Sequence, residues 1–252
     1  MKTVKLTLEY DGTDFNGWQI QDRKSRTVQG VLEKAAKTIF GKKIRVYGSG
    51  RTDSGVHARG QVAHFRAETR HAAATLQSAL NANLPDDVSV LAAVFAKANF
   101  HAQYNAKRKT YRYTVLNRHA KSPIERRFCL HYAHTLNITR LKHDAKILEG
   151  KHDFRSFTAA GSDTGPRQGE KLSTVRTVRK LNVTRKGDFI YFDIEADGFL
   201  YKMVRNIVGT LLESASGRRP AGEVARILRA RNRTRAGTTA PARGLCLERV
   251  VY

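Results

Sequence analysis

The 252-residue sequence carries 46 lysine and arginine residues against 22 aspartate and glutamate residues, a formal net charge of +24. Forty per cent of the residues are hydrophobic, enough to bury a core, which excludes a chain that is mainly a disordered basic tail. We expect no membrane span and no signal peptide, because apolar runs of the required length are missing. With Cys129 and Cys246 as the only cysteines, we expect reduced thiols, a cytoplasmic location and neither a disulfide framework nor a cysteine-rich zinc site.

The positive charge is unevenly distributed along the chain. Residues 1–105 hold 15 basic and 9 acidic side chains, whereas residues 106–252 hold 31 and 13. A surface of this charge attracts and concentrates polyanions, so we expect a nucleic acid as the partner. A membrane surface, an acidic protein, or a basic surface that serves solubility alone are the weaker alternatives.

The first half of the sequence shows alternating strand and helix patterns. Residues 3–10 alternate apolar and polar side chains, which predicts a half-buried strand. Apolar residues recur at helical spacing over residues 28–40, and Gly41 follows as a stop signal. The pattern then predicts, in chain order, strands over residues 43–47 and 61–66, a helix over residues 71–80 and a strand over residues 88–96.

The second half repeats this order. A strand is predicted over residues 111–116 and a helix over residues 138–148, with Asn137 as its N-cap and Gly150 as its stop. The pattern then predicts a hairpin of residues 178–185 and 189–196, an apolar helix over residues 200–212, an inserted basic helix over residues 221–231 and a strand over residues 245–251.

Both halves therefore show the order β-α-β-β-α-β, which predicts an α+β fold of two ferredoxin-like halves, residues 1–105 and 106–252. A single open α+β sheet made of unrelated halves is the alternative. Residues 159–173 collect glycine, serine and proline without apolar periodicity, which predicts a surface loop.

The segment most suggestive of chemistry is residues 48–57, G-S-G-R-T-D-S-G-V-H, which places Arg51 two residues before Asp53. Its spacing matches neither a Walker phosphate loop nor a dinucleotide-binding turn. An ordinary connection between strands with a solvated ion pair is the simpler interpretation. Against it, a carboxylate in a strongly basic protein is favoured in its ionised form, which a nucleophile requires.

Other candidate sites are weaker. The nine histidines show no metal-binding spacing, so we expect no metal. Tyr111 and Tyr113 lie on one side of a predicted strand, and a buried tyrosine pair of this kind also suits a core. Composition, spacing and charge thus indicate a basic, nucleic-acid-binding α+β protein with one conspicuous aspartate, and they leave the reaction undefined.

A family resemblance extends nearly from end to end of the sequence and rests on six segments in a fixed order. The sequence resembles the bacterial tRNA pseudouridine synthase A family in E-Y-D-G-T-D-F-N-G-W-Q-I-Q (residues 9–21), G-R-T-D-S-G-V-H-A-R-G-Q-V-A-H-F (50–65), N-A-N-L-P (81–85), F-H-A-Q-Y-N-A-K-R-K-T-Y-R-Y (100–113), F-L-Y-K-M-V-R-N-I-V-G (199–209) and G-T-T-A-P-A-R-G-L-C-L (237–247).

The resemblance implies an isomerase that converts uridines 38, 39 and 40 of the tRNA anticodon stem-loop to pseudouridine, without metal or cofactor. It also implies a homodimer, and a continuous antiparallel sheet in which an active-site cleft separates the two ferredoxin-like halves. By the same resemblance Asp53 is the catalytic aspartate, Arg51 helps to flip the target base, Tyr111 stacks on that base, and Arg205 pairs with the catalytic carboxylate. The apolar residues Phe199, Leu200 and Met203 would be either pocket wall or packing.

The basic segments 106–127 and 217–243 suit contacts with the backbone of a structured RNA. Two alternatives to this function remain at the level of sequence. One is an RNA-binding module without catalytic activity, and the other is a synthase that acts at a different RNA site.

Overall fold

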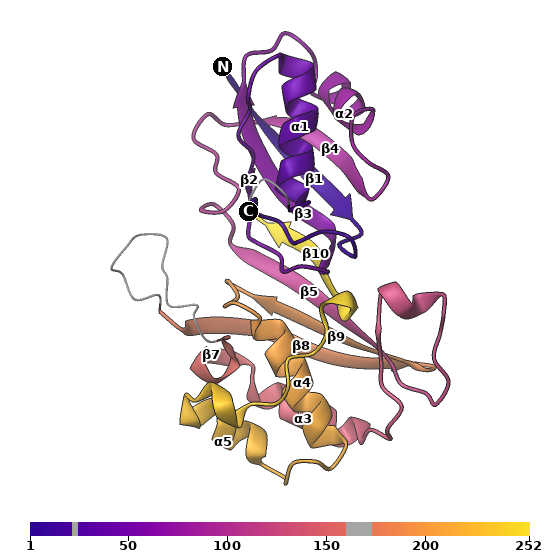
Figure 1. The fold of residues 1–252 in the computed structure, drawn as a ribbon. Helices are drawn as coiled ribbons and strands as arrows, with labels where there is room; N and C mark the ends of the chain where they lie inside the picture. Colours follow the sequence, from indigo (N-terminus) through magenta and orange to yellow (C-terminus); the bar gives the residue numbers. More distant parts are fainter. Residues whose placement is uncertain (22–24, 160–172) are drawn as a thin grey trace. The chain divides into compact units, whose positions relative to one another are not determined.

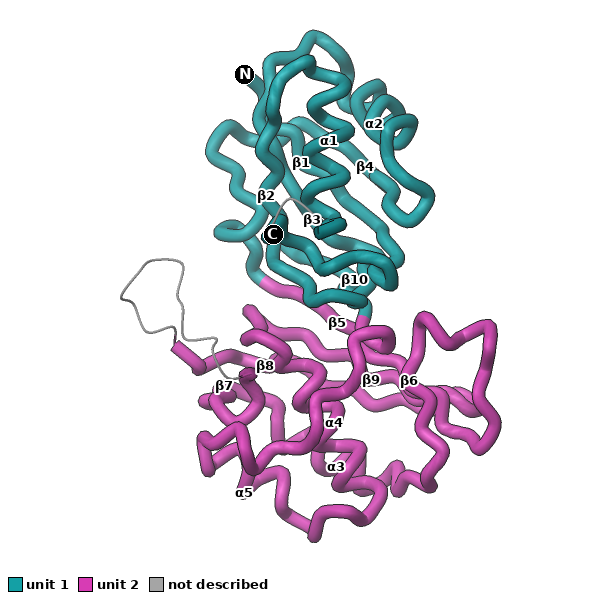
Figure 2. Tube along the Cα trace, viewed as in Figure 1, with its two compact units in different colours: residues 1–107, 246–252 teal, residues 108–245 magenta. Residues whose placement is uncertain are grey.

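Residues 1–21, 25–159 and 173–252 are described by a computed structural model of the chain (Figure 1). These residues form ten strands and five α-helices, a mixed α+β architecture. Most of the predicted loop 159–173, namely residues 160–172, lies outside the described residues. The chain divides into two compact units, in which unit 1 comprises Met1–Lys107 with Cys246–Tyr252 and unit 2 comprises Arg108–Leu245 (Figure 2).

Unit 1 is built on a sheet in which β4, β1 and β3 are neighbours and in which β2 and β10 both pair with β3. The pairs β1–β3, β1–β4 and β2–β3 are antiparallel. Its elements are β1 (Lys2–Tyr10), α1 (Val28–Phe40), β2 (Tyr47–Gly48), β3 (His57–Ala67), α2 (Ala73–Asn81), β4 (Val88–Ala96) and β10 (Leu245–Val251).

The core of unit 1 follows from the alternation in β1. Val4, Leu6 and Leu8 are buried, and α1 and α2 cover one face of this sheet (Figure 1). The ends of α1 are fixed by local chemistry, because Thr27 Oγ1 accepts a hydrogen bond from the third amide of the helix. At the other end Gly41 adopts φ +67° and its amide donates to the Lys37 carbonyl at 2.9 Å, the αL geometry that glycine accommodates without strain.

Unit 2 is built on a second set of strands in the order β5, β9, β8 and β7, with antiparallel pairs β5–β9, β8–β9 and β7–β8 and with β6 pairing with β5. Its elements are β5 (Arg108–Leu116), β6 (Leu130–His131), α3 (Ile138–Ile147), β7 (Gly150–Asp153), β8 (Val175–Lys186), β9 (Phe189–Ala196), α4 (Met203–Ala215) and α5 (Glu223–Ala230).

Helix α4 is the centre of unit 2 and packs against α3, α5 and β5. Most of its residues are buried, as its strongly apolar sequence predicts. Helix α3 begins as predicted, because Asn137 accepts a hydrogen bond from the Arg140 amide at 2.9 Å. It ends at Ile147, however, and Gly150 with φ +105° opens β7 rather than stopping the helix.

One detail of the predicted sheet is wrong. The end of the chain, Cys246–Tyr252, lies in unit 1, where Cys246 pairs with His57. This pairing is parallel, as is that of β6 with β5, so the strands are not uniformly antiparallel. A parallel pair requires a long connection, and most of unit 2 lies between β3 and β10 in the chain.

The strand predicted over residues 43–47 is also wrong, since only Tyr47 and Gly48 form β2. Within this range the side chains of Ile44 and Val46 are buried. The backbone of Val46 is nevertheless satisfied by side chains of α1: its amide donates to Glu33 Oε1 and its carbonyl accepts from Gln29 Nε2, each at 3.0 Å. These bonds replace the pairing with a neighbouring strand.

Candidate active site

Asp53 lies on the loop of residues 49–56, which connects β2 to β3 in unit 1. Its side chain is half-buried, whereas that of Arg51 is exposed and has no carboxylate partner among the residues that the structure describes. The Val56 amide donates to the Asp53 carbonyl at 3.2 Å and closes a tight turn at the aspartate. The loop thus presents a carboxylate and a guanidinium two residues apart.

Thr52, between these two residues, is held by the N-terminal segment. The Trp18 amide donates to the Thr52 carbonyl at 3.0 Å, and the Tyr10 hydroxyl lies 2.9 Å from Thr52 Oγ1. All three residues are buried. Burial raises the pKa of Tyr10 well above its ordinary value, so its hydroxyl stays neutral. These bonds fix the backbone immediately before Asp53.

The same segment approaches the loop so closely that it requires glycine. Gly17 has φ +87°, and a Cβ at this position would lie 2.6 Å from the Thr52 carbonyl oxygen. A Cβ on Gly12 would overlap the Val56 carbonyl. Most of the first sequence segment, residues 9–21, therefore has a structural role, because the Asp53 loop packs against it.

The beginning of the loop is held from β3. Ser49 donates from its amide to the Val62 carbonyl at 2.7 Å, and its hydroxyl bonds to Gln61 Oε1 at 2.6 Å. The same Gln61 donates from Nε2 to the Gly50 carbonyl at 3.1 Å. Because Ser49 and Gln61 are completely buried, these bonds are shielded from water and hold the loop at its entrance.

Sequence patterns alone did not single out the residues that support this loop, among them Tyr10, Thr52 and His57. His57 is buried at the start of β3, and its Nδ1 accepts the Gly12 amide at 3.0 Å and lies 3.1 Å from Asp11 Oδ1. All three lie within the segments that carry the family resemblance. Their contacts could not be deduced from spacing, since they join positions about 40 residues apart.

Tyr111 lies in the middle of β5 in unit 2 and is 8% exposed. Its ring meets that of Phe199 edge to face, with centroids 5.1 Å apart and an interplanar angle of 90°. Met203, one turn further on, is buried in the core. Phe199, which precedes α4, thus packs against Tyr111, whereas Met203, the first residue of α4, packs in the core.

Tyr113 and Arg205 hold two consecutive carbonyl groups. The Tyr113 hydroxyl donates to the Pro241 carbonyl at 2.8 Å, and Arg205 Nε donates to the Ala240 carbonyl at 2.7 Å. The Ala240 amide returns a bond to the Arg205 carbonyl at 3.1 Å. Tyr113 is therefore a core tyrosine whose buried hydroxyl has a hydrogen-bond acceptor. Arg205 is oriented by the segment that follows α5.

Further bonds clamp α4 to the same segment. Asn206 is completely buried: its Nδ2 donates to the Phe157 carbonyl at 2.8 Å, and its Oδ1 accepts Thr239 Oγ1 at 2.6 Å and Arg233 Nη2 at 3.1 Å. One helical turn later the Thr210 hydroxyl accepts the Gly237 amide at 2.9 Å. The last two sequence segments, residues 199–209 and 237–247, therefore fold against each other.

Glu213, one further turn along α4, also binds the segment that follows α5. Burial disfavours its ionised form, but the amide and hydroxyl of Thr238 and the guanidinium of Arg219 outweigh burial and lower the pKa of Glu213. The carboxylate accepts from Thr238 at 2.8 and 2.9 Å and from Arg219 at 2.8 Å. The orientation of Arg205 thus depends on a helix that is fixed along three turns.

The four predicted site residues fall into two pairs. Arg51 and Asp53 share one loop of unit 1, whereas Tyr111 and Arg205 belong to unit 2. In the described part of the chain, no group of three or more histidine, cysteine, aspartate or glutamate side chains could hold a metal ion. No helix among the described residues is long and apolar enough to cross a membrane.

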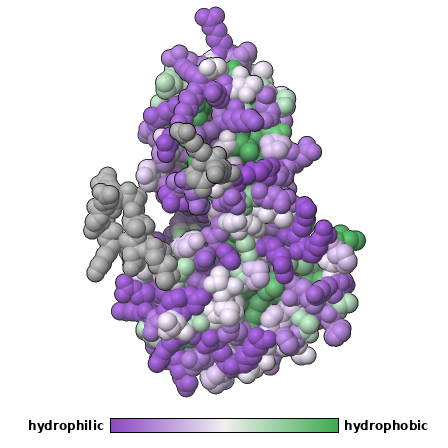
Figure 3. All heavy atoms as spheres, in the orientation of Figure 1, coloured by the Kyte–Doolittle hydropathy of each residue, from purple (hydrophilic) through white to green (hydrophobic). Residues whose placement is uncertain are grey.

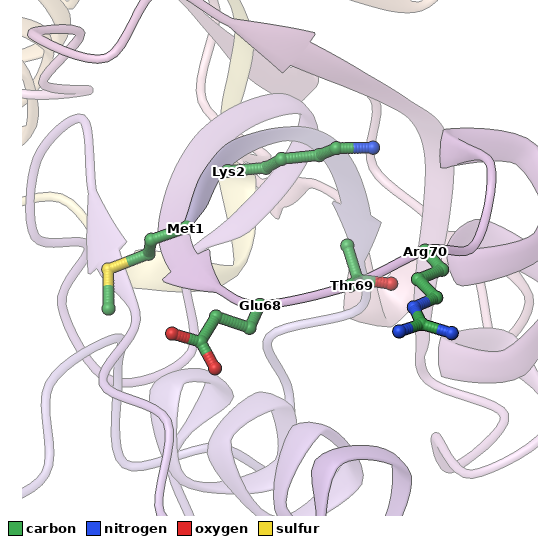
Figure 4. Close-up of a pocket in the computed structure, with 5 residues that line it drawn as sticks. All are labelled: Met1, Lys2, Glu68, Thr69 and Arg70. Carbon is green, nitrogen blue, oxygen red and sulfur yellow. The ribbon is translucent and has the colours of Figure 1, made fainter.

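A cavity of about 370 Å³ lies at the other end of β3, which begins after the Asp53 loop. The side chains around it point in different directions rather than toward a common point (Figure 4). Its position separates it from the candidate catalytic loop. It is lined by Met1, Lys2, Glu68, Thr69 and Arg70.

Comparison with known proteins identifies the family. The model of the family described as "tRNA pseudouridine synthase" matches residues 7–105 and 145–252. A tRNA pseudouridine synthase A of Thermoanaerobacter sp. (strain X514) is 46% identical over 252 residues, and one of Moorella thermoacetica is 47% identical over 253 residues, each covering 100% of both chains. That of Halalkalibacterium halodurans is 47% identical and covers 97% of this chain and 90% of its own. The chain belongs to the tRNA pseudouridine synthase family.

Proposed function

We propose that this protein is an isomerase that converts uridine to pseudouridine in tRNA, at positions 38, 39 and 40 of the anticodon stem-loop. The observation that carries the proposal is the Asp53 loop in a chain of this family. The loop presents a half-buried carboxylate, and hydrogen bonds from Tyr10, Trp18 and Gln61 fix its backbone. Preorganised placement of one reactive group is what a reaction without a cofactor requires.

The reaction is a rearrangement within one nucleotide. The glycosidic bond between N1 and C1′ breaks, the uracil turns, and a bond forms between C5 and C1′, while C5 loses a proton and N1 gains one. Nothing is oxidised and no group is transferred from outside. The Asp53 carboxylate suits either of two routes: attack at C1′, or stabilisation of the charge on the sugar while a C2′ proton leaves.

We propose a distinct role for each of the other predicted site residues. Arg51 enters the stem to displace the target base, and its exposed side chain without a carboxylate partner in the described chain supports this role. Tyr111 stacks on the displaced uracil, and the perpendicular Phe199 ring supports it from the edge. Arg205, oriented by the Ala240 carbonyl, supplies positive charge for the catalytic carboxylate.

Basic side chains of unit 2 would bind the RNA backbone. Arg218, Arg226, Arg229 and Arg231 are exposed, and hydrophilic residues cover most of the face shown in Figure 3. The exposed pairs of Arg226 with Glu223 and Arg231 with Asp153, both longer than 3 Å, restrain these side chains weakly. Phosphate groups can therefore replace the carboxylates at little cost.

The same proposal includes the topology of the two halves, the oligomeric state and the cellular location of the enzyme. We propose two ferredoxin-like halves, which the strand order β4-β1-β3-β2 in unit 1 and the order β5-β9-β8 in unit 2 support. The enzyme would act as a homodimer in the cytoplasm, and the free cysteines Cys129 and Cys246 suit a reducing compartment.

The test is to incubate the purified chain with an unmodified tRNA transcript and to map pseudouridine by nucleotide. We expect pseudouridine at one or more of positions 38 to 40 wherever the tRNA has uridine there. Pseudouridine at another site alone would assign the enzyme a different target. Tight tRNA binding without any pseudouridine would identify an RNA-binding module instead.

A further inference from the structure

Four aromatic rings form a contiguous cluster in unit 1, which we call the ring cluster: Tyr47, His64, His101 and Tyr104. Tyr47 stacks on His64 with centroids 5.3 Å apart, and His101 stacks on Tyr104 at 4.2 Å. The two histidines are 4.7 Å apart and join these pairs into one assembly. The cluster connects β2, β3 and the segment that follows β4.

The ring cluster lies on the face of the sheet opposite α1. In β1, Lys5 pairs with His64 of β3, whereas the next residue toward the N-terminus, Val4, pairs with Phe65. Successive residues of a strand point to opposite faces. Because Phe65 packs against Phe40 of α1, His64 must face away from that helix. The ring cluster is therefore outside the helix-covered core.

Backbone hydrogen bonds hold the two histidines in place. His64 Nδ1 accepts the Ala102 amide at 3.2 Å, and His101 Nδ1 accepts the amides of Gln103 and Tyr104 at 3.2 and 3.3 Å. Burial, reinforced by His101 and the nearby Arg66, lowers the pKa of His64 to about 4, so this ring is neutral at physiological pH. These bonds hold the rings of both histidines, against which the two tyrosines stack, in fixed positions.

The two tyrosines of the cluster face solvent. Tyr104 is 71% exposed and Tyr47 is 44% exposed, although each has a face stacked on a histidine. Neither hydroxyl has a hydrogen-bond partner among the described residues, and neither ring is needed to fill the core. Large aromatic side chains that stay exposed within one cluster are typical of a binding surface.

Uncompensated positive charge surrounds the rings. Arg45 lies over Tyr47 with its guanidinium 5.8 Å from the ring centroid, and Arg66 is exposed on β3 two residues from His64. Lys5 lies 4.4 Å from the centroid of the neighbouring Tyr252 ring. Within residues 1–21, 25–159 and 173–252, none of these three cations forms an ion pair with a carboxylate.

This combination favours nucleic acid over a second copy of the chain as the occupant. Proteins bind unpaired nucleotides by stacking bases on aromatic side chains and by placing cations along the backbone. A two-fold interface would bring the same patch against itself, and Lys5, Arg45 and Arg66 would then approach the like charges of the other copy. We propose that the ring cluster binds an unpaired nucleotide of the RNA substrate, with its base stacked on Tyr104 or Tyr47 and its phosphate beside Arg45 and Arg66.

The proposed site is separate from the Asp53 loop. That loop joins β3 at His57, and His64 lies seven residues further along the strand, a span of about 23 Å. The nucleotide bound here is consequently not the uridine that is isomerised. The inference depends on the proposed function only in taking RNA as the ligand.

The test uses the full chain and two matched pairs of variants. Tyr104→Leu and Tyr47→Leu remove a stacking ring, whereas Tyr104→Phe and Tyr47→Phe keep it and remove only the hydroxyl. The probe is a single-stranded RNA of about ten nucleotides, measured beside substrate tRNA at fixed salt. We expect each leucine variant to lose roughly 5- to 150-fold in affinity for the probe and each phenylalanine variant to stay within about twofold.

Equal affinity of the leucine and phenylalanine variants would overturn the inference. So would a change in oligomeric state of the leucine variants in sedimentation, which would make the ring cluster an interface between copies. A thermal midpoint close to that of the wild type would show that the exposed substitution at Tyr104 leaves the fold intact. If the wild-type chain formed no pseudouridine but Tyr104→Leu still weakened RNA binding, the proposed function would fail and this site would stand.

Discussion

Replacing Gly17 with alanine should displace the Asp53 loop without unfolding the protein. The new Cβ would lie 2.6 Å from the Thr52 carbonyl oxygen, where ordinary contacts begin at 3.4 Å, so the two segments must separate by about 0.8 Å. A displacement of about 1 Å at a catalytic group costs roughly 100-fold in rate. We therefore expect kcat to fall by about 10- to 100-fold.

The same substitution also places alanine at φ +87°, which costs about 1–2 kcal/mol of stability by itself. Gly41→Ala is the matched control. Gly41 has φ +67°, but nothing lies within 4 Å of a Cβ placed there, and the residue caps α1 rather than touching the loop. It should lose comparable stability with unchanged kcat.

The assay is tritium release from tRNA labelled at C5 of uridine, measured under saturating substrate, together with urea unfolding of both variants. An unchanged kcat for Gly17→Ala would refute the idea that the N-terminal segment positions Asp53. An equal loss of kcat in both variants would show that backbone strain, and not the contact with Thr52, is responsible.

Three further predictions follow from the structure. Asn206→Leu removes the hydrogen bonds of a completely buried amide to the buried Phe157 carbonyl and to the half-buried Thr239 and Arg233, and should cost about 2–4 kcal/mol in urea unfolding. Leucine at the exposed Thr184 should change stability by no more than about 0.5 kcal/mol. Because the pKa of His64 is about 4 in the folded protein and about 6.5 when unfolded, protonation favours unfolding, and the stability that His64 contributes is lost as pH falls from about 6.5 toward 4. The difference in stability between wild type and His64→Asn should accordingly shrink by about 1–2 kcal/mol between pH of about 7 and about 5, and a constant difference would contradict a neutral buried imidazole. Finally, the affinity for tRNA should fall steeply between about 50 and 200 mM salt through counterion release, and a flat response would rule out extensive phosphate contacts.

Helices and strands whose ends are set by neighbouring residues in the sequence were predictable from the sequence. Helix α1 was predicted over residues 28–40 and is found at Val28–Phe40, because Thr27 and Gly41 provide its caps. Strand β4 was predicted equally well, over residues 88–96. Helix α4 was predicted three residues too early, since Lys202 adopts the αL conformation with φ 58° and delays the start of the helix.

Features that depend on distant partners were not predictable. Strand β10 was correctly bounded at residues 245–251, yet nothing in its sequence indicates that it pairs in parallel with β3. Likewise residues 43–47 were predicted as a strand, but side chains of α1 take the hydrogen bonds of Val46. Pattern determines which side chains face inward, but tertiary contacts determine where backbone groups find partners.

The candidate site shows the same division. Residue types and spacing singled out Asp53 and Arg51, and the family resemblance added Tyr111 and Arg205. The residues that support them could be found only in three dimensions. Thr52, on the loop, is hydrogen-bonded to Tyr10 of β1, and Arg205 is oriented by a carbonyl group 35 residues later in the chain. The sequence segments that carry the family resemblance therefore include pairs that pack against each other in the structure.

The most direct test of the central claim is the activity of Asp53→Asn, which keeps the size of the side chain and removes its charge. Asp86→Asn is the control, because Asp86 is an exposed carboxylate of the same unit without an ion-pair partner in the described chain. We predict that Asp53→Asn releases tritium from C5-labelled uridine in tRNA at least about 1,000-fold more slowly than wild type, with tRNA affinity unchanged within about twofold, and that Asp86→Asn turns over normally. Substantial turnover by Asp53→Asn would contradict the assignment of the reaction to this carboxylate.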